Sequence, residues 1–414
     1  MEERKHHNRI GGLWVAPASG STHEVASAEG SVLGSWPRSG ADDLEAALDA
    51  ARQAGKPWRE LRHGLRVGIL RQGLETVVHA RSIDQGMADR LGLPVAECVR
   101  YRRQAFRRGD AVLRHAPGPQ PSNGVALVRV DARAAVSGLV EDVYAPLSRG
   151  LPTLLLSDPA MPFLADELCL ALDDAGLPRG ALSVLHDDGA TILRAAAARP
   201  EVKRVLVRGT SQLIQTAREA FDRRPPVSGA DDASFGAGVP GRGRYRFHGR
   251  VLSDRTFVVR SGSDPDGAAE EVVRRAFGPL ETWSGQAEGS VGRVLCHERI
   301  FSRFSEALLG TLDELTTEGN ALAALDPTIW DEIAARISLG LDEGATLILG
   351  EPTGSRRPRR DAILAPSVFT NAEPRMRLLR PGLPASVLVL MRCKDDAQAA
   401  TLADELDGET PNTD

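Results

Sequence analysis

Residues 283 to 300 read Trp-Ser-Gly-Gln-Ala-Glu-Gly-Ser-Val-Gly-Arg-Val-Leu-Cys-His-Glu-Arg-Ile. The first half of this stretch is rich in glycine and small polar residues, which is typical of a loop. The second half contains a short run, Arg293 to Cys296, that predicts a buried strand. The segment after it predicts an amphipathic helix, because apolar residues recur on one helical face: Phe301, Phe304, Leu308, Leu312 and Leu315.

This stretch resembles the most diagnostic segment of the aldehyde dehydrogenase superfamily. In that family an Asn-x-Gly-Gln-x-Cys motif carries the catalytic thiol and continues into a strand that ends in a His-Glu-x-Ile turn. The position of the nucleophilic cysteine holds Glu288 in this chain. Six residues match the family pattern at the same spacing and without a gap: Gly285, Gln286, Arg293, His297, Glu298 and Ile300.

The resemblance implies an α/β fold of the aldehyde dehydrogenase type. A Rossmann-type nucleotide-binding domain would be followed by an α/β catalytic-type domain, with the family's C-terminal part missing. It also implies a degenerate active site, because aldehyde oxidation needs a thiolate that adds to the carbonyl before hydride leaves. The carboxylate of Glu288 is a poor nucleophile toward an aldehyde. The nearest thiol, Cys296, falls in the predicted strand, so we do not expect it to act instead.

The bulk composition is typical of a soluble, cytoplasmic protein. The chain has 414 residues, a net charge of −5 and 42% hydrophobic residues. Its length predicts two or three domains, and its charge argues against a nucleic-acid partner. We expect no signal peptide and no membrane span. The four cysteines are widely separated in the sequence: Cys98, Cys169, Cys296 and Cys393. This spacing excludes a disulfide scaffold and a zinc module, and we predict no metal site.

Residues 1–221 are predicted to hold N-terminal helices and a Rossmann-like domain. Strands are expected at 124–130, 153–156, 181–185 and 204–208, with helices between them. This alternation predicts a doubly wound parallel sheet. The N-terminal helix from Asp42 is expected to stop at Gly55. The turn Ala175-Gly-Leu-Pro-x-Gly180 resembles the family closely.

Residues 222–248 are rich in glycine and proline and are interpreted as a linker or an insertion. Gly236-Ala-Gly-Val-Pro-Gly241 has the letters of a GxGxxG phosphate loop. We favour a linker, because Pro240 lies inside the motif and no convincing strand precedes it. Residues 249–404 are then the truncated catalytic-type domain, and residues 405–414 an acidic, frayed tail.

The resemblance implies NAD or NADP as the cofactor, but the positions that would bind it are degenerate. The lysine that holds the adenosine ribose aligns with Ser157, which lacks the cationic reach. Gly209 and Thr210 keep the start of a Gly-Ser-x-x-x-Gly turn that cradles the pyrophosphate at a helix N-terminus. Ile214 replaces its second glycine. The glutamate that holds the nicotinamide ribose aligns with Gly382.

The remaining catalytic positions of the family are also changed. Its Pro-Trp-Asn segment supplies an oxyanion-hole amide, and the aligned region, Asp131 to Ser137, has neither tryptophan nor asparagine. The loss of one oxyanion donor typically reduces the rate by about 10²–10³. The general-base glutamate aligns with Arg250, which reverses the charge.

Three functions follow as hypotheses. In the first, the protein is catalytically inactive and acts as a structural or regulatory binding subunit. In the second, it is an NAD(P)-dependent oxidoreductase that oxidises an aldehyde with an atypical site. In the third, Glu288 is a general base for non-redox chemistry. Since the chain ends before the family's oligomerisation strand, we also expect a protein partner, in a homo- or hetero-oligomer, that covers the exposed edge.

Residues 61 to 115 are predicted to be helical and are rich in arginine. A basic helix face could bind an anionic partner, and a solvated face with scattered salt bridges would also explain it. We favour the solvated face. The arginines at issue are Arg100, Arg102, Arg103, Arg107, Arg108 and Arg114.

Overall fold

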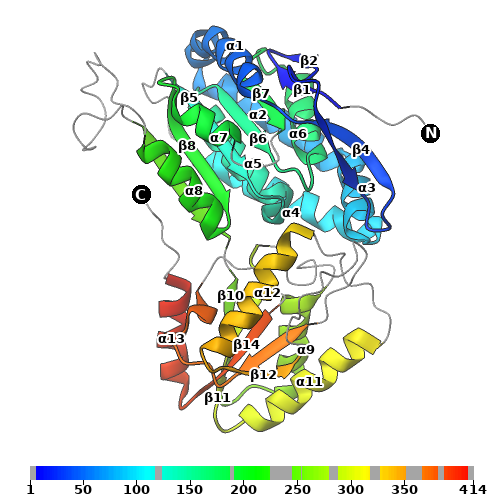
Figure 1. Ribbon diagram of the computed structural model, residues 1–414, viewed down its shortest axis with the longest axis vertical. Helices are drawn as coiled ribbons and strands as arrows, with labels where there is room; N and C mark the ends of the chain where they lie inside the picture. The colour runs from blue at the N-terminus through cyan, green and yellow to red at the C-terminus, as the bar shows by residue number, and fades with distance from the viewer. Residues whose placement is uncertain are drawn as a thin grey trace.

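The computed structural model describes residues 6–116, 124–186, 191–223, 245–252, 254–278, 288–317, 327–350, 366–380 and 387–408. The elements fall into two groups, each built around its own sheet (Figure 1). The first group, blue to green, carries the N-terminus. The second group, green to red, carries the C-terminal helix.

The first group opens with short strands and a run of helices. A hairpin of β3 and β4 forms its own two-stranded sheet, and β1 and β2 join the large sheet. The elements are β1 (Asn8–Ile10), β2 (Leu13–Val15), β3 (Thr22–Ala26), β4 (Val32–Pro37), α1 (Ala41–Glu60), α2 (His63–His79), α3 (Arg81–Leu91) and α4 (Val95–Arg114).

Alternating strands and helices then build a seven-stranded sheet in the order β2-β1-β7-β6-β5-β8-β9. All neighbours from β7 to β9 pair in parallel, which confirms the doubly wound α/β fold. The elements are β5 (Val125–Val130), η1 (Ala132–Ala134), α5 (Ala135–Ser148), β6 (Thr153–Ser157), α6 (Phe163–Asp174), β7 (Leu182–His186), α7 (Thr191–Ala197), β8 (Val202–Gly209), α8 (Ser211–Asp222) and β9 (Arg246–Val251).

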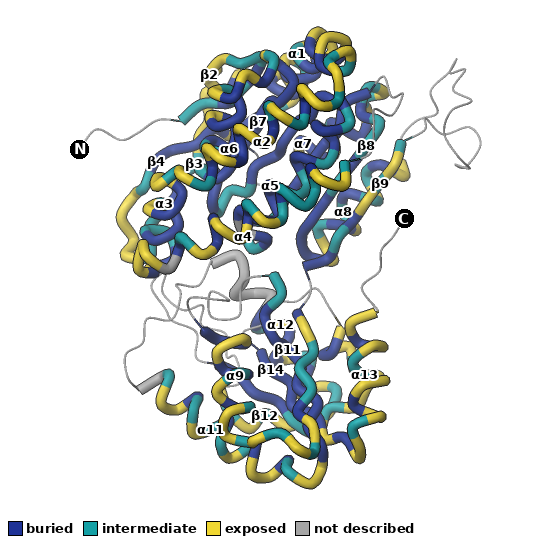
Figure 2. Tube along the Cα trace, turned by 180° about the vertical axis from the view of Figure 1, so that it is seen from behind, coloured by how far each residue is buried: buried dark blue, intermediate teal, exposed yellow. Residues whose placement is uncertain are grey.

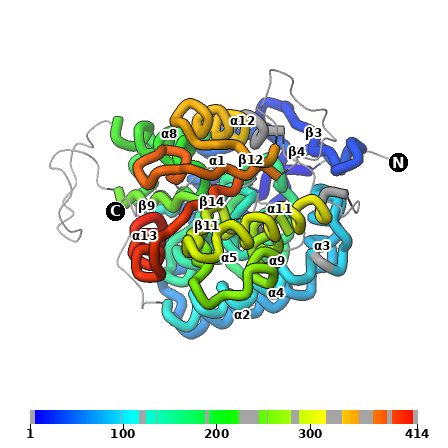
Figure 3. The backbone as a smooth tube through the Cα atoms, turned by 90° about the horizontal axis from the view of Figure 1, so that it is seen from below, coloured from blue at the N-terminus to red at the C-terminus, as the bar shows by residue number. Residues whose placement is uncertain are grey.

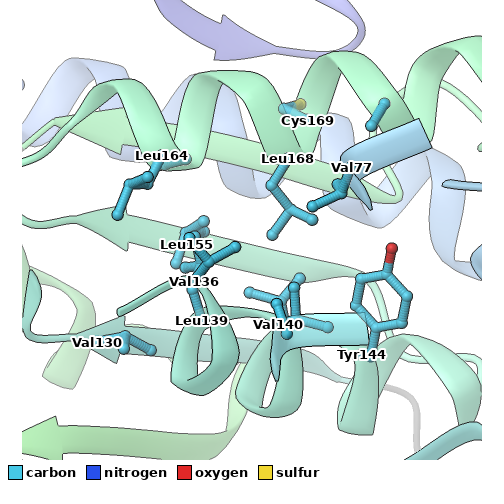
Figure 4. Close-up of a cluster of buried hydrophobic side chains, with 14 of the residues drawn as sticks. Val77, Val130, Val136, Leu139, Val140, Tyr144, Leu155, Leu164, Leu168 and Cys169 are labelled. Carbon is cyan, nitrogen blue, oxygen red and sulfur yellow. The ribbon is translucent and has the colours of Figure 1, made fainter. Parts of the chain in front are cut away.

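The central strands of this sheet are apolar because helices cover both of their faces. All residues of β5, β6 and β7 are buried (Figure 2). On one face, side chains of α5 and α6 meet Leu155 of β6, as Figure 4 shows for Leu139, Val140, Leu164 and Leu168. On the other face, α1, α7 and α8 pack against the sheet through a second cluster of buried side chains.

The second group has a five-stranded sheet in the order β10-β11-β14-β13-β12. Helices α9 and α11 lie on one side of β11 and β14, and α12 on the other (Figure 3). The elements are β10 (Arg255–Val259), α9 (Pro265–Phe277), β11 (Val291–His297), α11 (Phe301–Thr317), α12 (Pro327–Asp342), β12 (Thr346–Leu349), β13 (Ser367–Thr370), η2 (Arg377–Leu379), β14 (Val387–Cys393) and α13 (Asp396–Gly408).

The expected helix stop at Gly55 is wrong, because α1 continues through Pro57 to Glu60. Gly55 is a packing residue: a Cβ built on it would lie 3.3 Å from Cγ of Pro152. Trp58 in the last turn is buried, and its indole nitrogen donates a hydrogen bond of 3.1 Å to the carbonyl of Leu147. Tertiary packing therefore holds the last turn in helical form.

The chain crosses from the first sheet to the second after residue 251, and not at residue 248 as the sequence predicted. Strand β9 pairs with β8 up to Val251, so residues 249 to 251 belong to the first sheet, and β10 begins the second. At the C-terminal end, residues 405 to 408 are helical and not frayed, and Asp407 accepts a hydrogen bond of 3.1 Å from Arg293.

The GxGxxG letters at 236–241 lie outside the described residues. Within the described part of the chain, no helix is long and apolar enough to cross a membrane.

The turn at 175–180 gives a matched test of close packing. Gly176 and Gly180 both have left-handed backbones, with φ of 88° and 85°. A Cβ on Gly180 would lie 2.6 Å from the carbonyl oxygen of Ala50, and a Cβ on Gly176 would meet nothing within 4 Å. We predict that Gly176→Ala lowers the unfolding free energy by about 1–2 kcal/mol, the left-handed cost alone. Gly180→Ala should cost a further ~1–3 kcal/mol through overpacking.

Urea denaturation of both variants measures this difference. Equal losses of stability would contradict the close approach of α1 to this turn.

Candidate functional site

The carboxyl ends of β5 and β8 meet at the point where the strand order of the large sheet reverses. Ligands of doubly wound folds bind in the crevice outside such a switch point. Here the backbone N–H of Asp131, just after β5, donates a hydrogen bond of 2.9 Å to the carbonyl of Arg208 in β8. The side chain of Arg208 is 0% exposed. The centre of the candidate site is therefore a buried guanidinium.

Glu288, which the resemblance aligns with the family's nucleophile, lies directly on this guanidinium. Nη1 of Arg208 donates to Oε2 and Oε1 of Glu288 at 3.0 and 3.3 Å. The backbone N–H of Glu288 donates to the carbonyl of Arg133 at 2.9 Å. Arg250, at the position of the general base, has its Nε 3.8 Å from Oε1 of Glu288. The fold thus brings together Glu288 and Arg250, the two residues predicted to stand at catalytic positions.

Two carboxylates of α5 complete the ion-pair network around Arg208. Asp142 accepts hydrogen bonds from Nε and Nη2 of Arg208 at 2.6 and 2.8 Å. Glu141 accepts from Arg208 at 3.0 Å, from Arg250 at 2.9 Å and from Arg108 of α4 at 3.3 Å. We call this network the switch-point cluster: Arg108, Glu141, Asp142, Arg208, Arg250 and Glu288. It pairs three cations with three anions.

The pairing fixes the charge of the two groups that hold the cluster together. Burial alone would lower the pKa of Arg208, but hydrogen bonds to Asp142 and the charges of Asp142, Glu288 and Glu141 raise it well above its usual range. Burial alone would raise the pKa of Glu141, but Arg208 and Arg250 hold it below its usual range. Arg208 and Glu141 consequently stay charged across the physiological range.

This arrangement limits the chemistry that Glu288 can perform. Both of its oxygens accept hydrogen bonds from Arg208, and this ion pair opposes the transfer of a proton or an electron pair from Glu288. No cysteine replaces it. All four cysteines are buried, and burial together with the charge of Cys393 raises the pKa of Cys296 in β11 to about 12. A thiol in this state is not a thiolate nucleophile at neutral pH.

The region aligned with the oxyanion hole is also occupied by an ion pair. Asp131 accepts hydrogen bonds from Nε and Nη2 of Arg133 at 2.9 and 2.7 Å. Burial would raise the pKa of Asp131, but the charge and hydrogen bonds of Arg133 hold it below its usual range. The segment from Asp131 to Ser137 therefore packs a salt bridge beside Glu288.

Ser157, the aligned ribose position, faces into the protein. Its hydroxyl lies 2.6 Å from Nδ1 of His186, and both side chains are buried. His186 Nε2 lies 3.2 Å from Asp166, which also accepts a hydrogen bond of 2.8 Å from the indole of Trp36. Burial would raise the pKa of Asp166, but the charge of His186 and hydrogen bonds from His186, His6 and Trp36 hold it well below its usual range.

The aligned pyrophosphate turn is closed by its own side chains. The hydroxyl of Thr210 accepts the backbone N–H of Leu213 at 3.1 Å, which caps α8 in the place where a phosphate would bind. A Cβ on Gly209 would lie 2.6 Å from Cδ2 of Leu213, so the leucine side chain lies against the glycine. Ile214 is buried at 6% exposure. Gly382 lies outside the described residues.

A nicotinamide dinucleotide does not fit the residues present at these positions. The serine hydroxyl is engaged by His186, and the glycine face is covered by Leu213. The helix N-terminus is capped internally. Among the described residues, no group of three histidine, cysteine, aspartate or glutamate side chains could hold a metal ion.

The fold and the site together define a two-sheet α/β protein with a nucleotide-type domain and an altered catalytic crevice. The Aldehyde dehydrogenase family model matches residues 253–408. Two relatives are each 22% identical: the alpha-ketoglutaric semialdehyde dehydrogenase of Bacillus subtilis, over 98% of this chain and 84% of that protein, and the NADP⁺ succinate-semialdehyde dehydrogenase of Escherichia coli, over 96% and 82%.

Solved structures show the same fold. An NAD-dependent aldehyde dehydrogenase from Sinorhizobium meliloti superposes with a TM-score of 0.79 at 20% identity, over 97% of this chain and 80% of that one. An aldehyde dehydrogenase from Bartonella henselae gives a TM-score of 0.80 at 19% identity, over 97% and 85%. The chain is thus similar to aldehyde dehydrogenases over nearly its whole length and shares their fold, and the family model matches its C-terminal part.

Sequence reasoning missed the residues that dominate the site. The sequence pattern predicts Arg208 only as the end of a strand, and no recognisable motif includes Glu141 or Asp142. One signal was available: Arg208 is a charged residue within the buried carboxyl end of β8, and such a residue needs a partner. The pair Glu141-Asp142 stands out in the same way in an apolar helix.

Arg208 and Arg250 offer a matched test of the cluster. We predict that Arg208→Met lowers the unfolding free energy by about 3–5 kcal/mol, because it leaves Asp142 and Glu288 without their buried cation. Arg250→Met removes the same charge from a side chain that is 41% exposed, and should cost under ~1 kcal/mol. Urea unfolding at neutral pH measures both, and a small loss for Arg208→Met would contradict the cluster's structural role.

Proposed function

We propose that this member of the superfamily does not oxidise aldehydes and acts by binding, as a structural or regulatory subunit. The main support for this proposal is that Glu288, aligned with the nucleophile position, forms an ion pair with the buried Arg208. A site that must form a covalent thiohemiacetal cannot do so with a carboxylate engaged in an ion pair. The closed cofactor positions support the same reading, since hydride transfer needs a bound acceptor.

Edge strand β2 supports a protein partner. It lies at one end of the seven-stranded sheet. Its three apolar residues, Leu13, Trp14 and Val15, are 57%, 40% and 38% exposed. Exposed apolar residues on an unpaired strand edge are a common feature of protein interfaces. A partner that extends the sheet along β2 would cover them.

The second candidate is an NAD(P)-dependent oxidoreductase with an atypical site. The similarity to dehydrogenases over nearly the whole chain favours it. This function requires that Leu213 and the Ser157–His186 contact move aside to admit the cofactor. A general-base role for Glu288 would require that it separate from Arg208.

Turnover measurements distinguish the two candidates. With succinate semialdehyde or 2-oxoglutarate semialdehyde and either NAD⁺ or NADP⁺, we expect no reduced cofactor above the rate without protein. Glu288→Cys should also stay inactive, because the general-base and oxyanion positions remain changed. Turnover that Glu288→Gln abolishes would overturn the binding-subunit proposal and establish the oxidoreductase.

A further inference from the structure

A pocket of about 550 Å³ lies between α2 and α4. The two helices run side by side on the outer surface of the first group (Figure 3). The volume is in the range of small-molecule sites, roughly 300–1,000 Å³. The pocket lies outside the positions considered above. It is lined by Val78 of α2 and, from α4, by Ala96, Val99, Arg100, Arg103, Phe106 and Arg107.

Three of the residues that line this pocket carry large apolar side chains. Val78, Val99 and Phe106 are each half-buried, so part of their hydrocarbon surface remains open to the pocket. Phe106 is anchored, because its inner side packs against the core of the first group. A ligand that covers these side chains gains free energy from the apolar area removed from water.

The rim of the pocket is cationic. Arg100, Arg103 and Arg107 are exposed and fall at spacings of three and four residues, so they lie along one face of α4. The like charges of Arg103 and Arg107, four residues apart, repel each other and destabilise the helix. An anion bound between them would remove this repulsion.

The other arginines of α4 are already paired within the protein. Arg102 forms a salt bridge with Asp84, Arg108 with Glu141 and Arg114 with Asp110. Arg103 and Arg107 differ, since neither has a hydrogen bond or an ion pair with any residue that the structure describes. The helix thus separates arginines that serve the fold from two that are available to a ligand.

We propose that this pocket binds a small organic anion with an apolar body. The hydrocarbon part would lie on Val78, Val99 and Phe106, and a carboxylate or phosphate head would lie on Arg103 and Arg107. Guanidinium groups suit both heads, because their paired N–H donors match two oxygens at once. This site goes beyond the proposed function, and it does not depend on the state of the switch-point cluster.

Calorimetric titration with sodium decanoate, below its micelle concentration, tests the proposal. We expect saturable binding of one decanoate per chain, and no saturable heat from acetate, which lacks the apolar body. In the Arg103→Gln/Arg107→Gln double variant, the dissociation constant should rise at least tenfold. The matched control is Arg62→Gln/Arg114→Gln, which removes the same charge from exposed residues outside the pocket and should bind like the parent.

Two results would overturn the proposal. One is the absence of saturable heat with decanoate, and the other is equal affinity in the parent and the pocket variant. Flotation with vesicles that contain phosphatidylglycerol tests whether the arginines bind a membrane surface instead. Retention on such vesicles without decanoate binding would assign the arginines to a membrane surface and exclude the small-molecule site. Circular dichroism of each variant confirms that it is folded.

Discussion

The buried guanidinium of Arg208 is the constraint on which the crevice depends. A cation that is 0% exposed must be neutralised by anions within hydrogen-bonding distance. Asp142 and Glu141 supply two of these from α5, and Glu288 supplies the third from the segment before β11. The same contacts therefore satisfy Arg208, hold Glu288 in place and tie the second group of elements to the first. Glu288, predicted to stand at the nucleophile position, is therefore part of the structural framework.

The fold is that of aldehyde dehydrogenases, and the side chains at the predicted site positions contact one another. Parallel strands still deliver their carboxyl ends to one crevice, as ligand binding in doubly wound folds requires. The side chains there contact one another: Ser157 contacts His186, Leu213 covers Gly209 and Arg133 pairs with Asp131. Helix α4 carries arginines with two different roles. Arg108 forms an ion pair within the switch-point cluster, and Arg103 and Arg107 line the surface pocket.

The sequence predicted the framework better than the site, for physical reasons. Strands such as Thr153–Ser157 are continuous apolar runs between turn signals, so their local pattern defines them. Glu288 could be placed by its spacing from Gly285 and Gln286. Its partner could not, because Arg208 lies 80 positions away in the chain and only the fold brings them together. The end of α1 was missed for the same reason, since distant Leu147 and Pro152 hold its last turn.

The most direct test of the closed crevice is a calorimetric titration of the folded protein with NAD⁺ and with NADP⁺. If Ser157, Gly209 and Thr210 are engaged internally as described, neither dinucleotide gives saturable heat. Saturable binding of either one, at a stoichiometry of one per chain and weakened by Gly209→Val, would contradict this account. The crevice would then be a working nucleotide site, and the dehydrogenase chemistry of the superfamily would again be the leading explanation.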